Sequence, residues 1–422
     1  MAPSDASIHP AYFQIRRAAV IVSIGVGAGI GGAFVALLLH AVQHIAYGYS
    51  LDRLVGTESF LTGVTAATPG RRFAALLVCG LVAGCGWGAL YRWGKPLVSI
   101  RKAVGAADPR MPVSSTIIHA LLQIVTVALG SPLGREVAPR EIGALWSGWI
   151  AHRAGLPSAD QRVLVACGAG AGLAAVYNVP LGGAVFVLEV LLCTFAFSTL
   201  VPALATSAIA AFVAQFWLGN EHQYTVPHYV VDQTLLVGAI VCGPLFGAAA
   251  WVFVALTSRA RAHAPKDLRL PMYALINFVV IGALVIGFPA LAGNGRGPAG
   301  LAFDGALPLG LAALLLVLKV AIEVSTLRSG AEGGLLTPGL TNGALLALVL
   351  GGLWRLHFPG APLGAFAVVG AGAFLAASMQ MPITAIVLLL EFTHFDHDMV
   401  MPVLFAVVGS ISAFKVLGYL KS

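Results

Sequence analysis

The fold is decided by residues 168–190, which read GAGAGLAAVYNVPLGGAVFVLEV. Residues 370–392, which lie 202 positions later, read GAGAFLAASMQMPITAIVLLLEF, and the two stretches are identical at 11 of 23 positions without a gap. Pro180 matches Pro382, and Glu189 matches Glu391. A bias toward Gly and Ala does not account for the shared proline and glutamate together, so we interpret the two stretches as an internal repeat.

The composition excludes a water-soluble body. Hydrophobic residues make up 59% of the 422 residues and charged residues only 10%, whereas a soluble domain carries about 25% charged residues. Soluble enzymes, nucleic-acid-binding modules and disordered proteins are therefore excluded. The apolar runs are much longer than the roughly 10-residue strands of a membrane barrel, so we expect an all-α polytopic membrane protein. The net charge of +7 fits basic residues in short cytoplasmic loops and does not indicate a nucleic-acid partner.

The repeat predicts two transmembrane halves. We expect a cytoplasmic tail at 1–15, a first repeat at 16–218, a linker at 219–232 and a second repeat at 233–422, with no C-terminal regulatory domain. The chain has 50 Gly and 23 Pro, and several apolar segments are too short to cross a bilayer. Broken, partly re-entrant helices are typical of transporters and channels whose binding site lies at the midplane between two repeats.

Three Gly- and Pro-punctuated stretches precede or open apolar helices. They are Gly94-Lys95-Pro96-Leu97-Val98-Ser99-Ile100, Gly134-Arg135-Glu136-Val137-Ala138-Pro139 and Gly333-Gly334-Leu335-Leu336-Thr337-Pro338. A helix N-terminus has unpaired N–H groups and a partial positive charge. Several such ends aimed at one point would bind an anion without a fixed positive side chain. The alternative is that the three stretches are ordinary helix breaks.

Glu136 is the residue that we identify as a candidate functional carboxylate. It lies between apolar segments, and a carboxylate inside the membrane is by default a functional hypothesis. The alternative is a structural salt bridge to Arg135 or Arg140. We expect a structural role for the matched pair Glu189 and Glu391, and we expect no metal site, no cofactor and no enzymatic activity.

The motifs resemble those of the CLC family of chloride channels and proton-coupled chloride antiporters. The stretch GAGAGLAAVYNVPLGGAVFVLE resembles the signature in the first half of that family, and ASMQMPITAIVLLLEFT resembles the matching stretch of the second half. The GRE of residues 134–136 resembles the motif G-[KR]-E-G-P, and SGAEGGLLTP resembles S-G-x-x-G-G-x-F-x-P. The resemblance extends from about residue 17 to residue 418.

The resemblance implies a homodimer in the lipid bilayer, with one pore and two inverted halves in each subunit. It implies that Glu136 is the gating residue and proton acceptor. The anion-binding residues that it implies are Gly94, Lys95, Pro96, Leu97, Gly134, Arg135, Val137, Gly334, Leu335 and Leu336. Lys95 falls on the position of the family's central serine, and Val190 on that of the inner glutamate that many antiporters use for protons. The pore tyrosine belongs to a final helix that we do not expect in this chain.

We therefore expect transport of monovalent anions, chloride first, through a multi-pass protein of a bacterial inner membrane. Proton antiport is one interpretation, because Glu136 is present. A passive anion channel and a fluoride/proton antiporter of the same family are the alternatives. A membrane-embedded enzyme or a cation transporter is the alternative from another class; it would need a nucleophile, a metal cluster or several carboxylates within the membrane.

Overall fold

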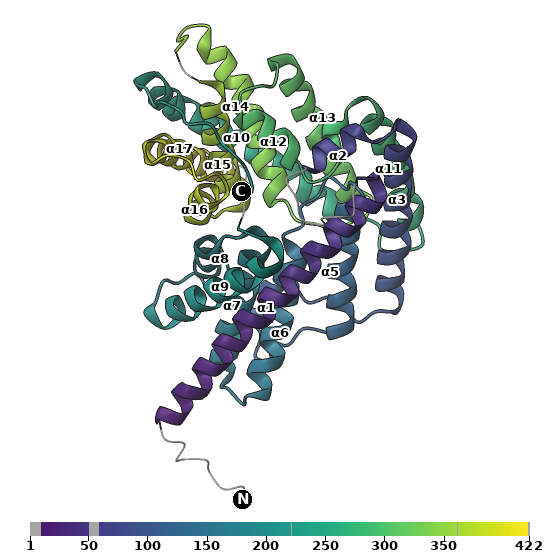
Figure 1. Cartoon of the computed structure of the whole chain (residues 1–422), viewed down its shortest axis with the longest axis vertical. Coiled ribbons are helices and arrows are strands. Elements are labelled where there is room, and N and C mark those ends of the chain that lie inside the picture. Colours follow the sequence, from purple (N-terminus) through teal and green to yellow (C-terminus); the bar gives the residue numbers. More distant parts are fainter. Residues whose placement is uncertain (1–9, 50–58, 221, 361, 421–422) are drawn as a thin grey trace, which may run out of the picture. The chain divides into compact units, whose positions relative to one another are not determined.

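The computed structural model describes residues 10–49, 59–220, 222–360 and 362–420, and this part of the chain is almost entirely helical, which confirms the predicted all-α class (Figure 1). The helices of the first half are α1 (Pro10–Tyr47), α2 (Phe60–Ala66), α3 (Pro69–Trp93), α4 (Ile100–Gly105), α5 (Val113–Ala128), α6 (Val137–Arg153), α7 (Ser158–Tyr177), α8 (Pro180–Phe186), the π-helix η1 (Val187–Leu191) and α9 (Phe197–Leu218). Those of the second half are α10 (Gln233–Ala262), α11 (Leu270–Gly287), the 3-10 turn η2 (Pro289–Leu291), α12 (Arg296–Phe303), α13 (Leu309–Arg328), α14 (Leu336–Arg355), α15 (Leu363–Met379), α16 (Pro382–Thr393), η3 (His397–Met399) and α17 (Val400–Tyr419). Residues 1–9 of the expected tail lie outside the described residues, and α1 already begins at Pro10.

Eight helices of the described chain are long and apolar enough to cross a membrane. They are Tyr12–Tyr47, Pro69–Trp93, Phe197–Leu218, Gln233–Ala262, Leu270–Gly287, Leu309–Arg328, Leu336–Arg355 and His397–Tyr419. Further apolar helices of 10–17 residues include Val113–Ala128 and Pro382–Thr393, which are too short for a full crossing. The mixture of long and short apolar helices is the arrangement expected from the Gly and Pro content.

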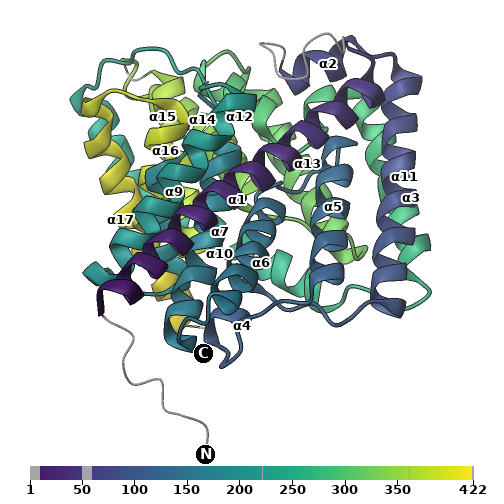
Figure 2. The same ribbon diagram turned by 60° about the horizontal axis from the view of Figure 1, so that its bottom comes forward.

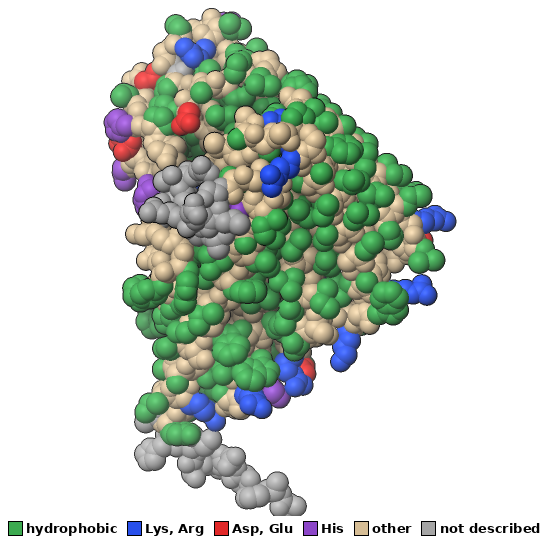
Figure 3. All heavy atoms as spheres, turned by 45° about the vertical axis from the view of Figure 1, so that its right-hand side comes forward, with side chains coloured by type: hydrophobic (Ala, Val, Ile, Leu, Met, Phe, Trp, Pro, Cys, Tyr) green, Lys and Arg blue, Asp and Glu red, His purple; other side chains and the backbone are tan. Residues whose placement is uncertain are grey.

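Large apolar side chains lie on the surface, as lipid contact requires. Phe34 is 60% exposed, Phe212 63% and Val317 66%. Figure 3 shows hydrophobic side chains over most of the visible face, with Lys and Arg side chains in separate groups. Since a soluble monomer rarely exposes so much contiguous apolar surface, these helices are suited to a bilayer.

The internal repeat is visible in the backbone. The residue that caps the C-terminus of α7 is Asn178, with φ 56° and ψ 50°, and the one that caps α15 is Gln380, with φ 54° and ψ 46°. Both are non-glycine residues in the left-handed conformation, which L-residues adopt only uncommonly. Pro180 and Pro382 then occupy the first turns of α8 and α16, where a missing N–H is harmless. The repeated sequence therefore produces the same helix–turn–helix twice.

The apolar sequence from residue 181 to residue 218 does not form one continuous helix. Regular helix changes to the π-helix η1 at Val187, and α9 begins only at Phe197. Cys193 has φ 52°, as His394 has φ 48° in the second half. Cys193 comes 13 positions after Pro180, whereas His394 comes 12 positions after Pro382. The wider π turn accommodates the extra residue.

The chain forms two compact units that do not coincide with the two halves. The first contains residues 97–117, 139–219 and α1 as far as Phe34; the second contains 35–96, 118–138 and the chain from Asn220 onward. Residues 118–138, which include Glu136, therefore pack with helices of the second half. The predicted repeat boundaries at 218 and 233 stay a prediction.

In the first unit, glycines let helix backbones approach closely. Helix α7 packs against α4, α8 and α9. A Cβ atom on Gly172 would overlap the Pro139 carbonyl, and one on Gly170 would overlap that of Gly183. Small residues at helix crossings are typical of membrane proteins, where close backbone contact replaces the hydrophobic effect. The GAGAG sequence is thus a packing motif.

In the second unit, α3 packs against α11, α10 against α17, and α14 against α15. Helices α3 and α11 lie side by side in both ribbon views (Figure 1 and Figure 2). Gly247 of α10 faces the Ser410 carbonyl of α17, and Gly343 of α14 faces that of Gly370 on α15. These contacts fix α14, whose first residue belongs to the candidate site.

Candidate functional site

The site is built around the carboxylate of Glu136, which is 0% exposed. Glu136 immediately precedes α6, and its Oε1 accepts a hydrogen bond of 2.7 Å from the backbone N–H of Leu336, the first residue of α14. The N-cap residue Leu335 makes no side-chain cap. The free N–H and the partial positive charge of this helix end therefore stabilise a negative carboxylate at a buried point.

Two glycines make room for the carboxylate. The loops that precede α6 and α14 pair as a short antiparallel bridge: Gly134 N–H donates to the Gly334 carbonyl at 2.8 Å, and Gly334 N–H donates to that of Gly134 at 2.9 Å. A Cβ atom on either glycine would overlap the Glu136 carboxylate. The sequence placed Gly134, Gly334 and Leu336 in one predicted site with Glu136, and the structure brings them together within the second unit.

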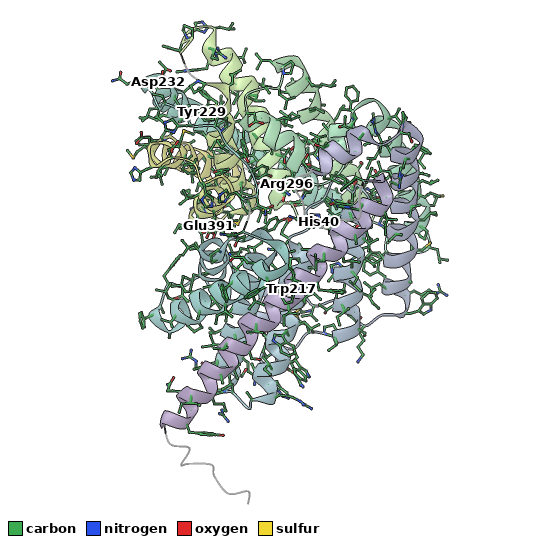
Figure 4. All side chains as sticks on the ribbon, in the orientation of Figure 1. His40, Trp217, Tyr229, Asp232, Arg296 and Glu391 are labelled. Carbon is green, nitrogen blue, oxygen red and sulfur yellow. The ribbon has the colours of Figure 1, made fainter. Side chains whose placement is uncertain are left out.

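Arg135, which directly precedes Glu136 in the same short loop, is 7% exposed. Its Nη2 donates to Gln223 Oε1 at 3.4 Å, while Nε of Arg296 donates to the backbone carbonyl of Gln223 at 3.0 Å. Residue 223 therefore holds two guanidinium groups. His40 of α1 lies within the electrostatic range of the Arg135 and Arg296 guanidinium groups. His40 and Arg296 are labelled in Figure 4. Gln223, Arg296 and His40 were not identified from the sequence as neighbours of Arg135, because no motif or spacing connects these residues with the stretch that contains Glu136.

The alternative partner Arg140 lies in the first unit. Its guanidinium stacks over the ring of Phe186 at 5.1 Å from the centroid. This cation–π contact holds the Arg140 side chain against Phe186, the last residue of α8. Val137, another of the anion-binding residues that the resemblance implies, is the first residue of α6.

The segment from Gly94 to Leu97 is less clearly a binding site. Helix α3 ends at Trp93, and the side chains of Lys95 and Pro96 are exposed. Helix α4 starts only at Ile100, and Ser99 caps it by accepting the N–H of Lys102 at 3.3 Å. The first donors of α4 thus lie well beyond Lys95 along the chain, and Leu97 belongs to the first unit. A role for this segment in anion binding stays a prediction.

Glu189 and Val190 lie in the π-helix η1 and are half-buried. The Val190 carbonyl accepts a hydrogen bond from Arg101 at 3.4 Å. The side chain at the position implied for an inner proton acceptor is therefore apolar.

A second buried polar cluster lies in the second unit and was missed. Lys319 and Glu323 of α13 and Asn342 of α14 are all 0% exposed. Asn342 Nδ2 donates to Glu323 Oε2 at 2.7 Å, and Lys319 Nζ lies 3.8 Å from Glu323 Oε1. Two opposite charges one helical turn apart in an apolar run were a readable signal for this cluster.

Comparisons with known proteins agree on one family. A family model described as "Voltage gated chloride channel" matches residues 74–414. A protein of Ralstonia nicotianae described as "Putative chloride channel protein ClcB-like" is 31% identical over 379 residues, which cover 85% of this chain and 86% of that protein.

Two solved structures share the fold. A slow cyanobacterial Cl⁻/H⁺ antiporter superposes with a TM-score of 0.80 at 20% identity, covering 98% of this chain and 96% of that one. A CLC-type fluoride/proton antiporter superposes with a TM-score of 0.71 at 19% identity, covering 97% and 98%. The expected fold of broken membrane helices is thereby confirmed.

Proposed function

Because this chain belongs to the voltage-gated chloride channel (CLC) family, and is therefore an anion transport protein of the membrane and not an enzyme, we propose that it carries chloride in exchange for protons. Glu136 is both the gate and the proton acceptor. The exchange takes place across the inner membrane of a bacterium, in a homodimer with one pathway in each subunit.

One observation carries the proposal. A buried carboxylate oxygen sits 2.7 Å from the first N–H of α14, in the position that a permeant anion would take at the same helix end. The carboxylate is itself an anion, so it and chloride compete for one donor. A side chain that imitates the transported ion is the simplest gate that this geometry offers.

Proton exchange follows from the same competition. A proton on Glu136 removes its charge and weakens its hydrogen bond to Leu336, since charge-assisted bonds are roughly twice as strong as neutral ones. The neutral side chain leaves, and the N–H of Leu336 becomes available to chloride. When Glu136 loses its proton, it returns and displaces the anion. Each return of the carboxylate thus links the release of a proton to the release of an anion.

A passive chloride channel is the second candidate, and Val190 favours it. An apolar residue at the position of the inner proton acceptor interrupts the proton route that the resemblance implies. In that case protonation of Glu136 opens the pathway but moves no proton across the membrane. Fluoride/proton antiport, the activity by which one structural neighbour is described, is tested by the same assay with a different ion.

The test is joint measurement of anion and proton flux in liposomes that contain the purified protein. A chloride gradient should drive protons uphill, and potassium flux should be undetectable. Chloride flux without proton movement would contradict the proposed antiport and support a passive chloride channel. Fluoride flux far above chloride flux would contradict chloride as the transported anion and support fluoride.

A further inference from the structure

We propose that Glu323 is a second proton-binding site inside the membrane, and that a proton bound there strengthens anion binding at the α14 N-terminus. The inference rests on the proposed function. It starts from a pattern of hydrogen bonds in which Glu323 Oε1 and Asn342 Oδ1, both fully buried, make no hydrogen bond.

The two unpartnered atoms match each other chemically. Asn342 Nδ2 donates to Glu323 Oε2 at 2.7 Å, which is one of the two hydrogen bonds of a ring between an amide and a carboxylic acid. The second bond of such a ring joins the remaining two oxygens, Glu323 Oε1 and Asn342 Oδ1. Two acceptors cannot bond without a hydrogen between them. An ionised carboxylate only accepts, whereas a protonated one also donates through its O–H, so a proton on Oε1 satisfies both atoms.

The ionised form of Glu323 is poorly compensated. The ammonium of Lys319 donates to the carbonyl of Gly293 at 2.8 Å and lies 3.8 Å from Glu323 Oε1, beyond hydrogen-bond distance. Buried ion pairs offset the loss of hydration only when their geometry is good and their remaining atoms are bonded. The charged pair lacks that geometry, and the protonated acid can donate the bond that the charged form cannot make, so the cluster can hold a proton on Glu323.

Other ionisable groups do not take the place of Lys319. Helix α13 packs against α10, α11, α14 and η2. The ionisable side chains on these elements, in addition to Arg328 of α13 itself, are Cys242, Arg259, Arg261, Tyr273 and Arg355. Within the described chain, the Glu323 carboxylate accepts a hydrogen bond from Asn342 and pairs with Lys319. Arg259, Arg261, Arg328 and Arg355 all lie in the last turns of their helices.

The cluster is connected to both elements that hold Glu136. Lys319 bonds the Gly293 carbonyl, and the N–H of Gly293 donates to the Gly130 carbonyl at 2.9 Å. Gly130 lies near the start of the loop that leads from α5 to Glu136. Asn342 lies on α14, whose first N–H binds the Glu136 carboxylate. A proton on Glu323 leaves the charge of Lys319 uncompensated behind this helix end, and the positive field attracts an anion there.

The test is calorimetric titration of chloride into detergent-solubilised protein in two buffers of different ionisation enthalpy, which counts the protons bound with each anion. Glu136→Gln serves as the background because it removes the gate proton. In that background, chloride binding should take up protons, and chloride affinity should rise about fivefold or more from pH 8 to pH 5, the lower end of usual couplings between sites. Adding Glu323→Gln should abolish both effects, whereas adding Asp108→Asn, an exposed carboxylate, should leave both.

A third variant guards against misfolding, because Glu323→Gln leaves a buried ammonium. Lys319→Met with Glu323→Gln removes both charges, a replacement that buried pairs often tolerate, and should equally abolish proton uptake. Proton uptake that persists without Glu323, or that is absent in the Glu136→Gln background, overturns the inference while chloride binding itself still supports the proposed function. Absence of chloride binding in the wild-type protein overturns both.

Discussion

The substitution Gly334→Ala should displace the Glu136 carboxylate from the N-terminus of α14. The added Cβ atom would overlap Oε1 and the carboxyl carbon of Glu136. The hydrogen bond between Glu136 and Leu336 is then lost, and a charged hydrogen bond contributes about 1.5–3 kcal/mol. The methyl group also fills the place of an anion bound to the same N–H, so chloride loses a comparable contact.

We expect chloride affinity to fall about 10- to 150-fold, which is that free energy converted at 1.4 kcal/mol per factor of ten. The affinity is measured by calorimetry and the flux in liposomes, and flux should also become nearly independent of pH. Gly310→Ala on α13 is the matched control, because a Cβ atom there meets nothing within 4 Å. A well-folded Gly334→Ala protein with wild-type affinity and pH dependence would refute the assignment of this helix end as the binding point.

Three further variants test other parts of the account. Lys95→Ser should lower apparent chloride affinity by less than about fivefold, because an exposed charge contributes at most about 1 kcal/mol; unchanged affinity in a concentration series would assign Lys95 to lipid headgroups or solvent. A hydrogen bond from Arg110 lowers the pKa of Asp108 to about 2, so the stability it adds is complete above the ordinary value near 3.8 and is lost as pH falls toward 2. The melting-temperature difference between wild type and Asp108→Asn should therefore be the same at pH 5 and pH 7, and a difference that changes between them would contradict that pKa. Gly247→Val should destabilise the protein by about 1–3 kcal/mol or more, seen as a lower melting temperature, because its side chain would meet the Ser410 carbonyl; an unchanged melting temperature would contradict the close packing of α10 and α17.

The helix breaks could be predicted because the residues that cause them are distinctive. Pro180 and Pro382 cannot continue a helix from the preceding turn, and their matched positions gave the repeat. The resemblance placed Glu136 and Leu336 in one predicted site, and the hydrogen bond between them came from the structure. Local chemistry and a repeat are sufficient for such features.

Features that depend on tertiary packing could not be predicted from the sequence. The π turn at Val187 lies in the stretch VFVLEVLL, in which no glycine or proline marks the change from regular to wider helix. The Lys319 and Glu323 pair was visible as two charges on one apolar helix, but its third member, Asn342, is supplied by α14. Gln223, which bonds two arginines through different atoms, has no signal of its own.

The central claim is that one carboxylate both closes the anion pathway and carries the exchanged proton. Glu136→Gln keeps the shape of the side chain and removes its charge and its ability to take up a proton. Chloride and proton fluxes measured together in liposomes, with the external pH varied from about 4.5, close to the ordinary pKa of a glutamate, to about 7.5, give the most direct test. The account predicts that the wild-type protein moves chloride faster at low pH and drives protons uphill, while Glu136→Gln retains chloride flux, loses most of its pH dependence and moves no protons. A well-folded Glu136→Gln protein that still drives protons along a chloride gradient, with the wild-type dependence on pH, would contradict it.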